Sequence, residues 1–366
     1  MVKALYFHIP FCSYKCPYCD FTSFVEPVAD YKAYLNLLLK ELELYANLSF
    51  QVKTIYFGGG TPSLIKPELY QWFLKRLSTL VPLSEVEEIT IECNPENYGL
   101  EEYKKLRDIS FNRVSVGVQS LREEGLRALG RLHSVEDALK SLDCAHRAGF
   151  DNLNADFIYG YSGHGIEELK QELELLAELP LSHVSFYLLT PYEDTQFGHL
   201  YQKGLFKLPD EDTIADMFEL IADRLEGLGF VHYEVSNFSK PGYECKHNMF
   251  YWTQEEFLGL GTSAWSFVGD VRFGNTKNIK LYAEKVMAGI RPVEQEERLQ
   301  DLEKLYDYIF VALRTKKGVD KRLLGELPES FLELFEEDHG RLRLNRKGML
   351  LINEVLLSLR DLILYR

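Results

Sequence analysis

Short β-rich runs alternate with segments of helical periodicity through the first two-thirds of the chain, and this alternation constrains the fold more than any other feature. Strands and helices that alternate at this spacing predict a parallel sheet with right-handed crossovers. Six such units predict either a partial, TIM-like (β/α)6 barrel or a doubly wound sheet. The expected strands are 4–9, 54–57, 88–92, 113–119, 153–159 and 183–189, and the clearest helices between them are 31–46, 67–80, 135–148 and 166–179.

Polar or glycine-rich clusters follow five of these strands at their carboxyl ends. In both architectures the carboxyl ends of parallel strands meet at one edge, where ligand sites and active sites form. Turn formation alone does not account for five such clusters at one edge, so we expect a functional site there. The clusters are 10–19, 58–62, 92–95, Gln119 and Asp156.

The last third of the chain has a different pattern. Helical periodicity and a high density of charge begin at about residue 292 and predict a small helix-rich C-terminal domain of winged-helix type. The predicted domains are therefore 1–230, 231–290 and 291–366. Within the last two we expect an extended segment at 232–238, an aromatic stretch at 250–252, helices at 299–313 and 329–336, and a final helix.

Composition limits the classes of partner and compartment. The 366 residues include 41 Lys and Arg against 56 Asp and Glu, a formal charge of −15. This balance weighs against nucleic-acid binding and against attachment to an anionic membrane. No apolar run reaches the roughly 18 residues of a membrane span, since charged and amide residues interrupt 349–364. With no signal peptide and no evenly paired cysteines, we expect a cytoplasmic protein without a transmembrane segment.

Cys12, Cys16 and Cys19 form a C-x-x-x-C-x-x-C motif directly after the first strand. A loop can turn three thiolates toward one centre, and [4Fe–4S] clusters generally use four. Phe21 stands two residues after the last cysteine, so the motif leaves one iron open to an exchangeable ligand. The alternatives are a zinc site that adds His8, and three buried thiols without metal. The spacing and the flanking aromatic residues resemble the radical-SAM superfamily, in which S-adenosylmethionine (SAM) occupies the open iron.

The glycine run 58–60, followed by Thr61, comes directly after the second strand. Glycines let backbone groups approach a small ligand closely, although a plain tight turn explains this run equally well by itself. Its place one β/α unit after the cysteine loop resembles the radical-SAM motif that holds the methionyl amino group of SAM. Side chains near later strand ends suit the ribose hydroxyls, the ammonium and the carboxylate of SAM. These are Glu92, Gln119, Asp156 and Arg131.

Together these motifs resemble the anaerobic coproporphyrinogen III oxidase family of the radical-SAM superfamily, from about residue 3 to the end of the chain. The matching segments are 6–12, 57–62, 92–95, 115–120 and 156–160. The resemblance implies a partial (β/α)6 TIM-like barrel of the radical-SAM type, with a [4Fe–4S] cluster on Cys12, Cys16 and Cys19. The SAM contacts that it implies are Tyr6, Gly59, Gly60, Thr61, Glu92, Gln119, Arg131 and Asp156.

Three features favour the HemW-type branch of that family over the oxidase itself. The oxidase carries a fourth cysteine where this chain has Phe21, and a longer segment before the cluster loop. Residues 245–252 contain the HNxxYW motif of the HemW branch. The resemblance implies a haem chaperone that binds haem and hands it to respiratory haem proteins, with an electron donor for its cluster. The rival interpretations are an oxygen-independent coproporphyrinogen III oxidase, which is a radical decarboxylase, and another radical-SAM enzyme that modifies haem.

His247 is the candidate haem ligand, because a neutral imidazole suits haem iron. Phe250, Tyr251 and Trp252 would supply a flat aromatic wall for the macrocycle. A hydrogen-bonded core histidine beside an aromatic packing cluster is the alternative for these residues by themselves. Cys245 is a second candidate, as a thiolate ligand or an attachment point.

Two positions depart from the family pattern. Residues 159–164 read Tyr-Gly-Tyr-Ser-Gly-His where relatives commonly have a Leu-Pro-Gly-Gln run, so contacts from the loop around Ser162 are not carried over. Trp265 stands where HemW-like sequences often have a histidine, and any haem contact made by that histidine is lost here.

Overall fold

The computed structural model describes residues 1–25, 30–325 and 327–364. Its first six strands pair in parallel, each with the next along the chain, as the alternation predicted. The second strand begins at Phe50, earlier than expected, because Phe50 pairs with Val2 at the start of the first. The strands are β1 (Val2–Ile9), β2 (Phe50–Gly59), β3 (Glu88–Cys93), β4 (Arg113–Gln119), β5 (Asn152–Tyr159) and β6 (His183–Leu188).

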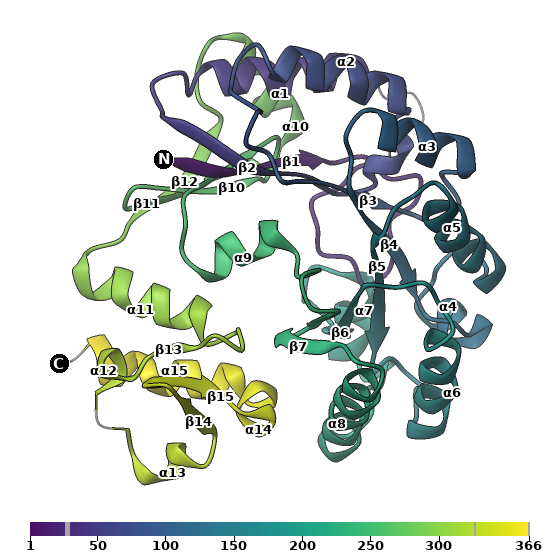
Figure 1. The fold of residues 1–366 in the computed structure, drawn as a ribbon, viewed down its shortest axis with the longest axis vertical. Helices are drawn as coiled ribbons and strands as arrows, with labels where there is room; N and C mark the ends of the chain where they lie inside the picture. Colours follow the sequence, from purple (N-terminus) through teal and green to yellow (C-terminus); the bar gives the residue numbers. More distant parts are fainter. Residues whose placement is uncertain (26–29, 326, 365–366) are drawn as a thin grey trace.

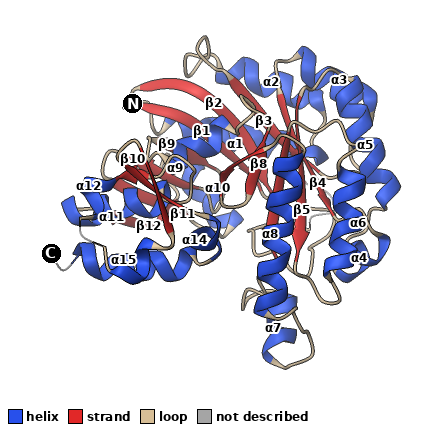
Figure 2. Cartoon of the chain, turned by 60° about the horizontal axis from the view of Figure 1, so that its bottom comes forward, coloured by secondary structure: helices blue, strands red, loops and turns tan. Residues whose placement is uncertain are grey.

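Helices follow these strands and cover the outer face of the sheet (Figure 2). The four helices expected from the sequence are present, and each ends one to three residues before the predicted position. The helices of this region, in chain order, are α1 (Tyr31–Glu43), the 3-10 turn η1 (Pro62–Leu64), α2 (Pro67–Leu77), α3 (Leu100–Asp108), α4 (Glu123–Ala128), α5 (Val135–Arg147), α6 (Ile166–Leu176), α7 (Gln196–Gln202) and α8 (Glu211–Gly227). Of these, α3, α4, α7 and α8 were not named from the sequence, because their periodic segments are short or follow the last parallel strand.

Later segments extend the parallel sheet at both edges. The expected extended segment 232–238 is a hairpin of β7 (Val231–Glu234) and β8 (Asn237–Ser239), which joins antiparallel to β6. On the other edge β9 (Phe257–Leu260) pairs in parallel with β1. Three antiparallel strands continue from β9, and helix α10 (Ile279–Met287) packs against α1. They are β10 (Trp265–Val268), β11 (Val271–Asn275) and β12 (Val293–Arg298), so the twelve-stranded order is β12-β11-β10-β9-β1-β2-β3-β4-β5-β6-β8-β7.

The strands form an arc, and helix α9 (Lys246–Trp252) lies inside it (Figure 1). Helix α9 contacts both β1 and β2. The chain therefore has the expected partial (β/α)6 barrel, lengthened at both edges of its parallel sheet.

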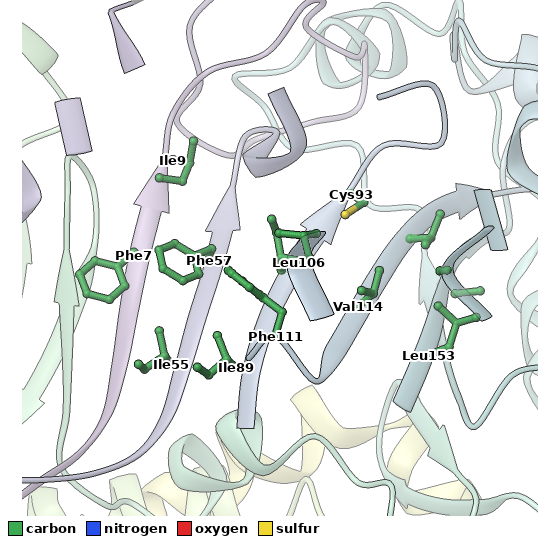
Figure 3. Close-up of a cluster of buried hydrophobic side chains, with 14 of the residues drawn as sticks. Phe7, Ile9, Ile55, Phe57, Ile89, Cys93, Leu106, Phe111, Val114 and Leu153 are labelled. Atoms are coloured by element: carbon green, nitrogen blue, oxygen red, sulfur yellow. The ribbon is translucent and has the colours of Figure 1, made fainter. Parts of the chain in front are cut away.

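Alternation along the parallel strands separates apolar from polar side chains. Successive residues of a strand point to opposite faces of the sheet. The outward residues pack under the helices: the rings of Phe7 and Phe57 stack with centroids 5.1 Å apart, and Phe111 lies beside Phe57 (Figure 3). Each such buried Phe contributes about 1.5–3 kcal/mol to stability. The inward positions carry polar residues instead, such as Glu92 and Ser115, so the interior of the arc is built for a site.

The C-terminal residues form a second hydrophobic core. Helices α11 (Asp301–Ala312) and α15 (Ile352–Leu364) pack together, and the final helix is amphipathic and packs in this core. The expected helix 329–336 is wrong in its second half, because Phe335 begins a strand. The other elements are β13 (Val319–Asp320), α12 (Lys321–Leu324), α13 (Glu329–Leu332), β14 (Phe335–Asp338), β15 (Arg341–Leu344) and α14 (Arg346–Leu350).

The predicted domain boundaries and the winged-helix type stay predictions. Strand β12 belongs to the main sheet and runs to Arg298, so that sheet continues beyond the predicted boundary at residue 290. None of the helices in the described part of the chain combines the length and the apolar character needed to cross a membrane.

Candidate cluster and cofactor site

The three cysteines lie in the loop between β1 and α1, at the carboxyl edge of the parallel strands. Two backbone hydrogen bonds fix the start of this loop. The N–H of Cys12 donates to the carbonyl oxygen of Phe24 at 3.0 Å, and the N–H of Thr61 donates to that of Phe11 at 2.7 Å. The second bond ties the cysteine loop to the glycine turn after β2, so the structure brings these two predicted clusters together.

Each cysteine sulfur has a hydrogen-bond donor from the protein. The hydroxyl of Thr61 lies 3.5 Å from Cys12 Sγ, and the guanidinium Nη1 of Arg131 lies 3.2 Å from Cys16 Sγ. Lys15 Nζ lies 3.9 Å from Cys19 Sγ. Burial raises the pKa of the Cys19 thiol, and the Lys15 ammonium acts against that rise. Cationic donors favour the thiolate form, which is the form that binds metal.

This donor set fits an iron–sulfur cluster better than a single ion. No group of three His, Cys, Asp or Glu side chains among the described residues is arranged to hold one metal ion. In a [4Fe–4S] cluster each thiolate binds a different iron, so three partly exposed sulfurs on one loop do not have to meet at one point. The zinc alternative needs a free nitrogen on His8. Both of its ring nitrogens are engaged instead: Nε2 donates to the carbonyl oxygen of Thr22 at 2.8 Å, and Nδ1 lies 3.2 Å from the hydroxyl of Tyr6.

The glycine turn is shaped by its neighbours as well as by any ligand. Gly59 has φ +110°, and a Cβ there would lie 2.5 Å from the His8 ring. A Cβ on Gly60 would lie 2.7 Å from the carbonyl oxygen of Phe11. Both positions therefore require glycine for the packing of β1 against β2. Contact of Gly59, Gly60 and Thr61 with SAM stays a prediction.

Glu92, at the end of β3, holds this turn from the inner face. Its carboxylate accepts the N–H of Gly59 at 3.1 Å and the hydroxyl of Tyr56 at 2.8 Å. Burial raises the pKa of Glu92 to about 7, and the Asp156 carboxylate adds to that rise. The predicted acceptor is therefore preorganised at the inner edge of the site, beside the ring of Tyr6, which stacks on Tyr56 at 6.0 Å.

Asp156 and Gln119 lie on the same inner face, on adjacent strands. Asp156 accepts hydrogen bonds from Ser115 and from Asn154, both at 2.8 Å. Gln119 ends β4 with φ +68°, where the register between β4 and β5 shifts. A positive φ is uncommon outside glycine and marks a constrained position.

Arg131 is placed by the cluster loop itself. One guanidinium nitrogen binds Cys16, and Nη2 lies 3.0 Å from the side-chain oxygen of Asn94. Its Nε is buried and has no hydrogen-bond partner among the described residues. One N–H is thus left for a ligand, and the predicted contact with the SAM carboxylate stays a prediction.

His247 lies inside the barrel and is fully buried. Its Nδ1 is 2.8 Å from the hydroxyl of Thr54, and its Nε2 is 2.7 Å from the hydroxyl of Tyr251. Burial lowers the pKa of His247 to about 3, so the imidazole is neutral. Because both nitrogens are occupied, haem ligation by His247, which stays a prediction, requires one of these bonds to break.

The expected aromatic wall is wrong. Residues 250–252 are consecutive in α9, and successive helical side chains point about 100° apart. Tyr251 faces His247, Phe250 lines a cavity on another side, and Trp252 lies 5.9 Å from the Arg314 guanidinium. Cys245 is also fully buried, with its sulfur 3.7 Å from Glu88 Oε1, so it is not presented as an attachment point.

Residues 6–176 match the family model described as the radical SAM superfamily. The protein named heme chaperone HemW from Lactococcus lactis is 36% identical to this chain, over 92% of this chain and 87% of its own length. That from Bacillus subtilis is 31% identical, over 97% and 98%. The chain belongs to the HemW family. Among solved structures, the coproporphyrinogen III oxidase HemN of Escherichia coli has the same fold, with a TM-score of 0.82 at 23% identity, covering 100% of this chain and 91% of that one.

Sequence reasoning missed a chain of inward polar residues in this HemW-family protein. Asn154 binds Asp156, its Oδ1 accepts from His183 Nδ1 at 2.6 Å, and His183 Nε2 accepts from the hydroxyl of Tyr233 at 2.7 Å. Tyr233 in turn accepts the backbone N–H of Cys245, the residue before α9, at 3.3 Å. The signal was available as polar residues at every second position of otherwise apolar strands β3 to β6.

Glu88 and Arg113 belong to the same missed set. The Glu88 carboxylate accepts the backbone N–H groups of Lys246 at 3.0 Å and of His247 at 3.1 Å, and so caps α9. Arg113 is buried nearby, with Nε unpartnered among the described residues, and its charge contributes to lowering the pKa of His247.

The residues at both departures from the HemW pattern pack against close neighbours in the chain or sheet. In the loop around Ser162, the His164 ring stacks on Tyr161 at 4.1 Å, and its Nδ1 lies 3.3 Å from the N–H of Gly160. Trp265 is 44% exposed and lies over Gly274, where a Cβ would be 2.9 Å from the indole ring.

Proposed function

We propose that this chain is a cytoplasmic haem chaperone, which binds haem and hands it to haem-requiring respiratory proteins. Its identity of 36% and 31% to two proteins named heme chaperone HemW, over 92% and 97% of this chain, supports this proposal. The HNxxYW motif in 245–252 supports it as well. The proposal includes an electron donor that reduces the cluster.

The observation that carries the proposal is the position of α9, the helix with this motif. It lies inside the barrel, bonded through His247 to Thr54 of β2, whose carboxyl end forms the glycine turn of the cofactor site. The polar chain from Asp156 through His183 and Tyr233 reaches the backbone of Cys245, at the start of α9. Cofactor site and motif helix are therefore physically connected, which suits a protein whose cofactors control haem release.

The donor set of the cysteine loop suits a [4Fe–4S] cluster on Cys12, Cys16 and Cys19. When bound, the cluster supplies a redox centre with one iron open to SAM. Arg131 holds the sulfur of Cys16, and its buried Nε has no hydrogen-bond partner among the described residues. Glu92 orients the Gly59 turn, and Asp156 is held by two donors at the start of the polar chain.

The rate of haem transfer to a haem-free acceptor protein tests the proposed function. Anaerobically reconstituted protein loaded with haem is mixed with the haem-free form of a respiratory cytochrome, with and without SAM. We expect transfer faster than from serum albumin and dependent on SAM. Tyr233→Phe removes only the hydroxyl in the polar chain and should abolish the SAM dependence, whereas the exposed Tyr201→Phe should not. A wild-type protein that binds no haem, or transfers it no faster than albumin, contradicts the proposal.

A second candidate is oxygen-independent coproporphyrinogen III oxidase activity, favoured by the fold shared with HemN. Anaerobic incubation with coproporphyrinogen III, SAM and a reductant tests it. A vinyl-bearing product at catalytic yield would establish this activity and contradict a function restricted to haem transfer.

A further inference from the structure

A cavity of about 630 Å³ lies between α9, the start of β2, β7 and the loop 315–317 of the C-terminal region. It is separate from the cysteine loop and from every residue predicted to contact SAM. Small-molecule sites of roughly 300–1,000 Å³ hold ligands of drug or cofactor size. Its lining includes Val231, Tyr233, Met249, Phe250, Lys316 and Lys317.

Helix α9 presents a different face to this cavity than to the sheet. His247 and Tyr251, four residues apart, bond to each other, and His247 also bonds to Thr54 of β2. Lys246, Met249, Phe250 and Thr253 line the cavity. Their spacing of three, four and seven residues places them on one side of a helix. The motif helix therefore carries one face that holds it in the barrel and another that is available to a ligand.

The cavity is apolar in part and cationic at its rim. Met249 and Phe250 are half-buried on α9, and Tyr233 is buried on β7. Four lysines line the cavity against two glutamates. Lys53 and Lys246 already pair with acidic side chains at 2.6 and 2.8 Å. Lys316 and Lys317 are exposed, and neither side chain forms an ion pair within the described part of the chain.

We infer that this cavity is the haem site, with Met249 Sδ as an axial ligand and Lys316 and Lys317 paired with the two propionates. The inference rests on the proposed function. A thioether is an established ligand of haem iron, and an apolar macrocycle with two carboxylates matches a pocket with an apolar wall and two unpaired ammonium groups. His247 stays in its bonds to Thr54 and Tyr251 and serves as the residue that positions α9.

Haem titration followed by absorbance tests the two parts separately. Met249→Leu conserves volume, and should change the spectrum of bound haem and lower its reduction potential, because methionine ligation raises that potential. Lys316→Ala combined with Lys317→Ala should weaken haem binding about tenfold, as expected for two partly exposed ion pairs. Added salt should weaken wild-type binding more than it weakens binding by this double variant.

Matched controls remove the same groups elsewhere. Met287→Leu changes an exposed methionine of α10, and Lys75→Ala with Arg76→Ala removes two adjacent exposed cations of α2. Both controls should bind haem as the wild type does. If the wild type binds haem but Met249→Leu and the lysine double variant match it in spectrum and affinity, the cavity is not the site, although the proposed function stands. If the wild type binds no haem, the proposed function itself fails.

Discussion

The imidazole Nε2 of His247 lies 2.7 Å from the hydroxyl of Tyr251, one turn further along the same helix. With Nδ1 bonded to Thr54, this contact leaves the ring fully engaged inside the barrel. A buried histidine held in this way stabilises the position of α9, and it becomes an iron ligand only after a bond is broken. In this geometry the role of His247 is therefore structural: its two hydrogen bonds hold α9 in place.

Tyr251→Phe removes only the hydroxyl that bonds His247. A buried polar atom left without its partner costs about 1–3 kcal/mol, so we expect the free energy of unfolding to fall by that amount. Urea denaturation measures it, with the exposed Tyr201→Phe as a control that should change little. Haem affinity and spectrum should stay close to wild type, because the inferred site lies on the other face of α9. An unchanged free energy of unfolding would show that the bond does not hold the helix.

Glu88→Gln tests the cap of α9. The wild-type carboxylate accepts two backbone N–H groups at the first turn, and the neutral amide offers a single oxygen without the negative charge that suits a helix N-terminus. We expect a loss of about 1–2 kcal/mol in the free energy of unfolding and faster hydrogen exchange across Lys246–Trp252.

Glu87→Gln is the matched control for that change. Glu87 is the adjacent, exposed carboxylate, and it pairs with the side chain of Lys246 instead of the helix backbone. It should leave exchange in α9 at the wild-type rate. Equal exchange in both variants would mean that Glu88 is not the cap that holds α9.

The parallel half of the fold was predictable because strands 113–119 and 153–159 alternate with amphipathic helices in a regular pattern. The cluster loop was predictable because a C-x-x-x-C-x-x-C motif is a specific signature of a loop that binds an iron–sulfur cluster. Placing α9 inside the arc was not, because seven residues carry no periodicity that identifies a neighbour. Its contacts with Glu88 and Tyr233 join residues far apart in sequence, and such pairing depends on the closed tertiary structure.

The prediction of a flat aromatic wall was wrong because residues 250–252 form part of a helix. Phe250, Tyr251 and Trp252 are adjacent in sequence, but a helix sends adjacent side chains in different directions. An extended segment would have put two of the three on one face. The prediction assumed no secondary structure there, and helical geometry then divided the three rings among three environments.

Glu92→Gln tests the buried carboxyl beneath the glycine turn. Burial raises the pKa of Glu92 from 4.5 in the unfolded chain to about 7, so the folded protein favours the protonated form. That contribution to stability is present below about pH 4.5 and is lost as the pH rises toward 7. The variant cannot ionise, so its stability relative to wild type should be higher at pH 8 than at pH 5.

Urea denaturation at the two pH values measures this difference in the protein without SAM. Glu174→Gln, on the exposed face of α6, is the control and should show the same difference from wild type at both pH values. A Glu92→Gln curve parallel to wild type from pH 5 to pH 8 would mean that Glu92 ionises in the folded protein as it does in the unfolded chain.

Arg131→Lys tests the guanidinium that links the cluster loop to the predicted SAM carboxylate. The wild-type fork bonds Cys16 and Asn94 together and keeps Nε free, whereas an ammonium is a single point that cannot hold the same geometry. We expect about tenfold weaker SAM binding, the loss of about one charge-assisted hydrogen bond, together with a lower iron content after anaerobic reconstitution. Equilibrium dialysis and iron analysis measure the two effects.

Arg127→Lys is the control for this change. It alters an exposed arginine of α4 that pairs with Glu124, and it should match wild type in both SAM binding and iron content. If Arg131→Lys matches wild type too, the cluster loop does not depend on the planar fork, and another residue binds the carboxylate.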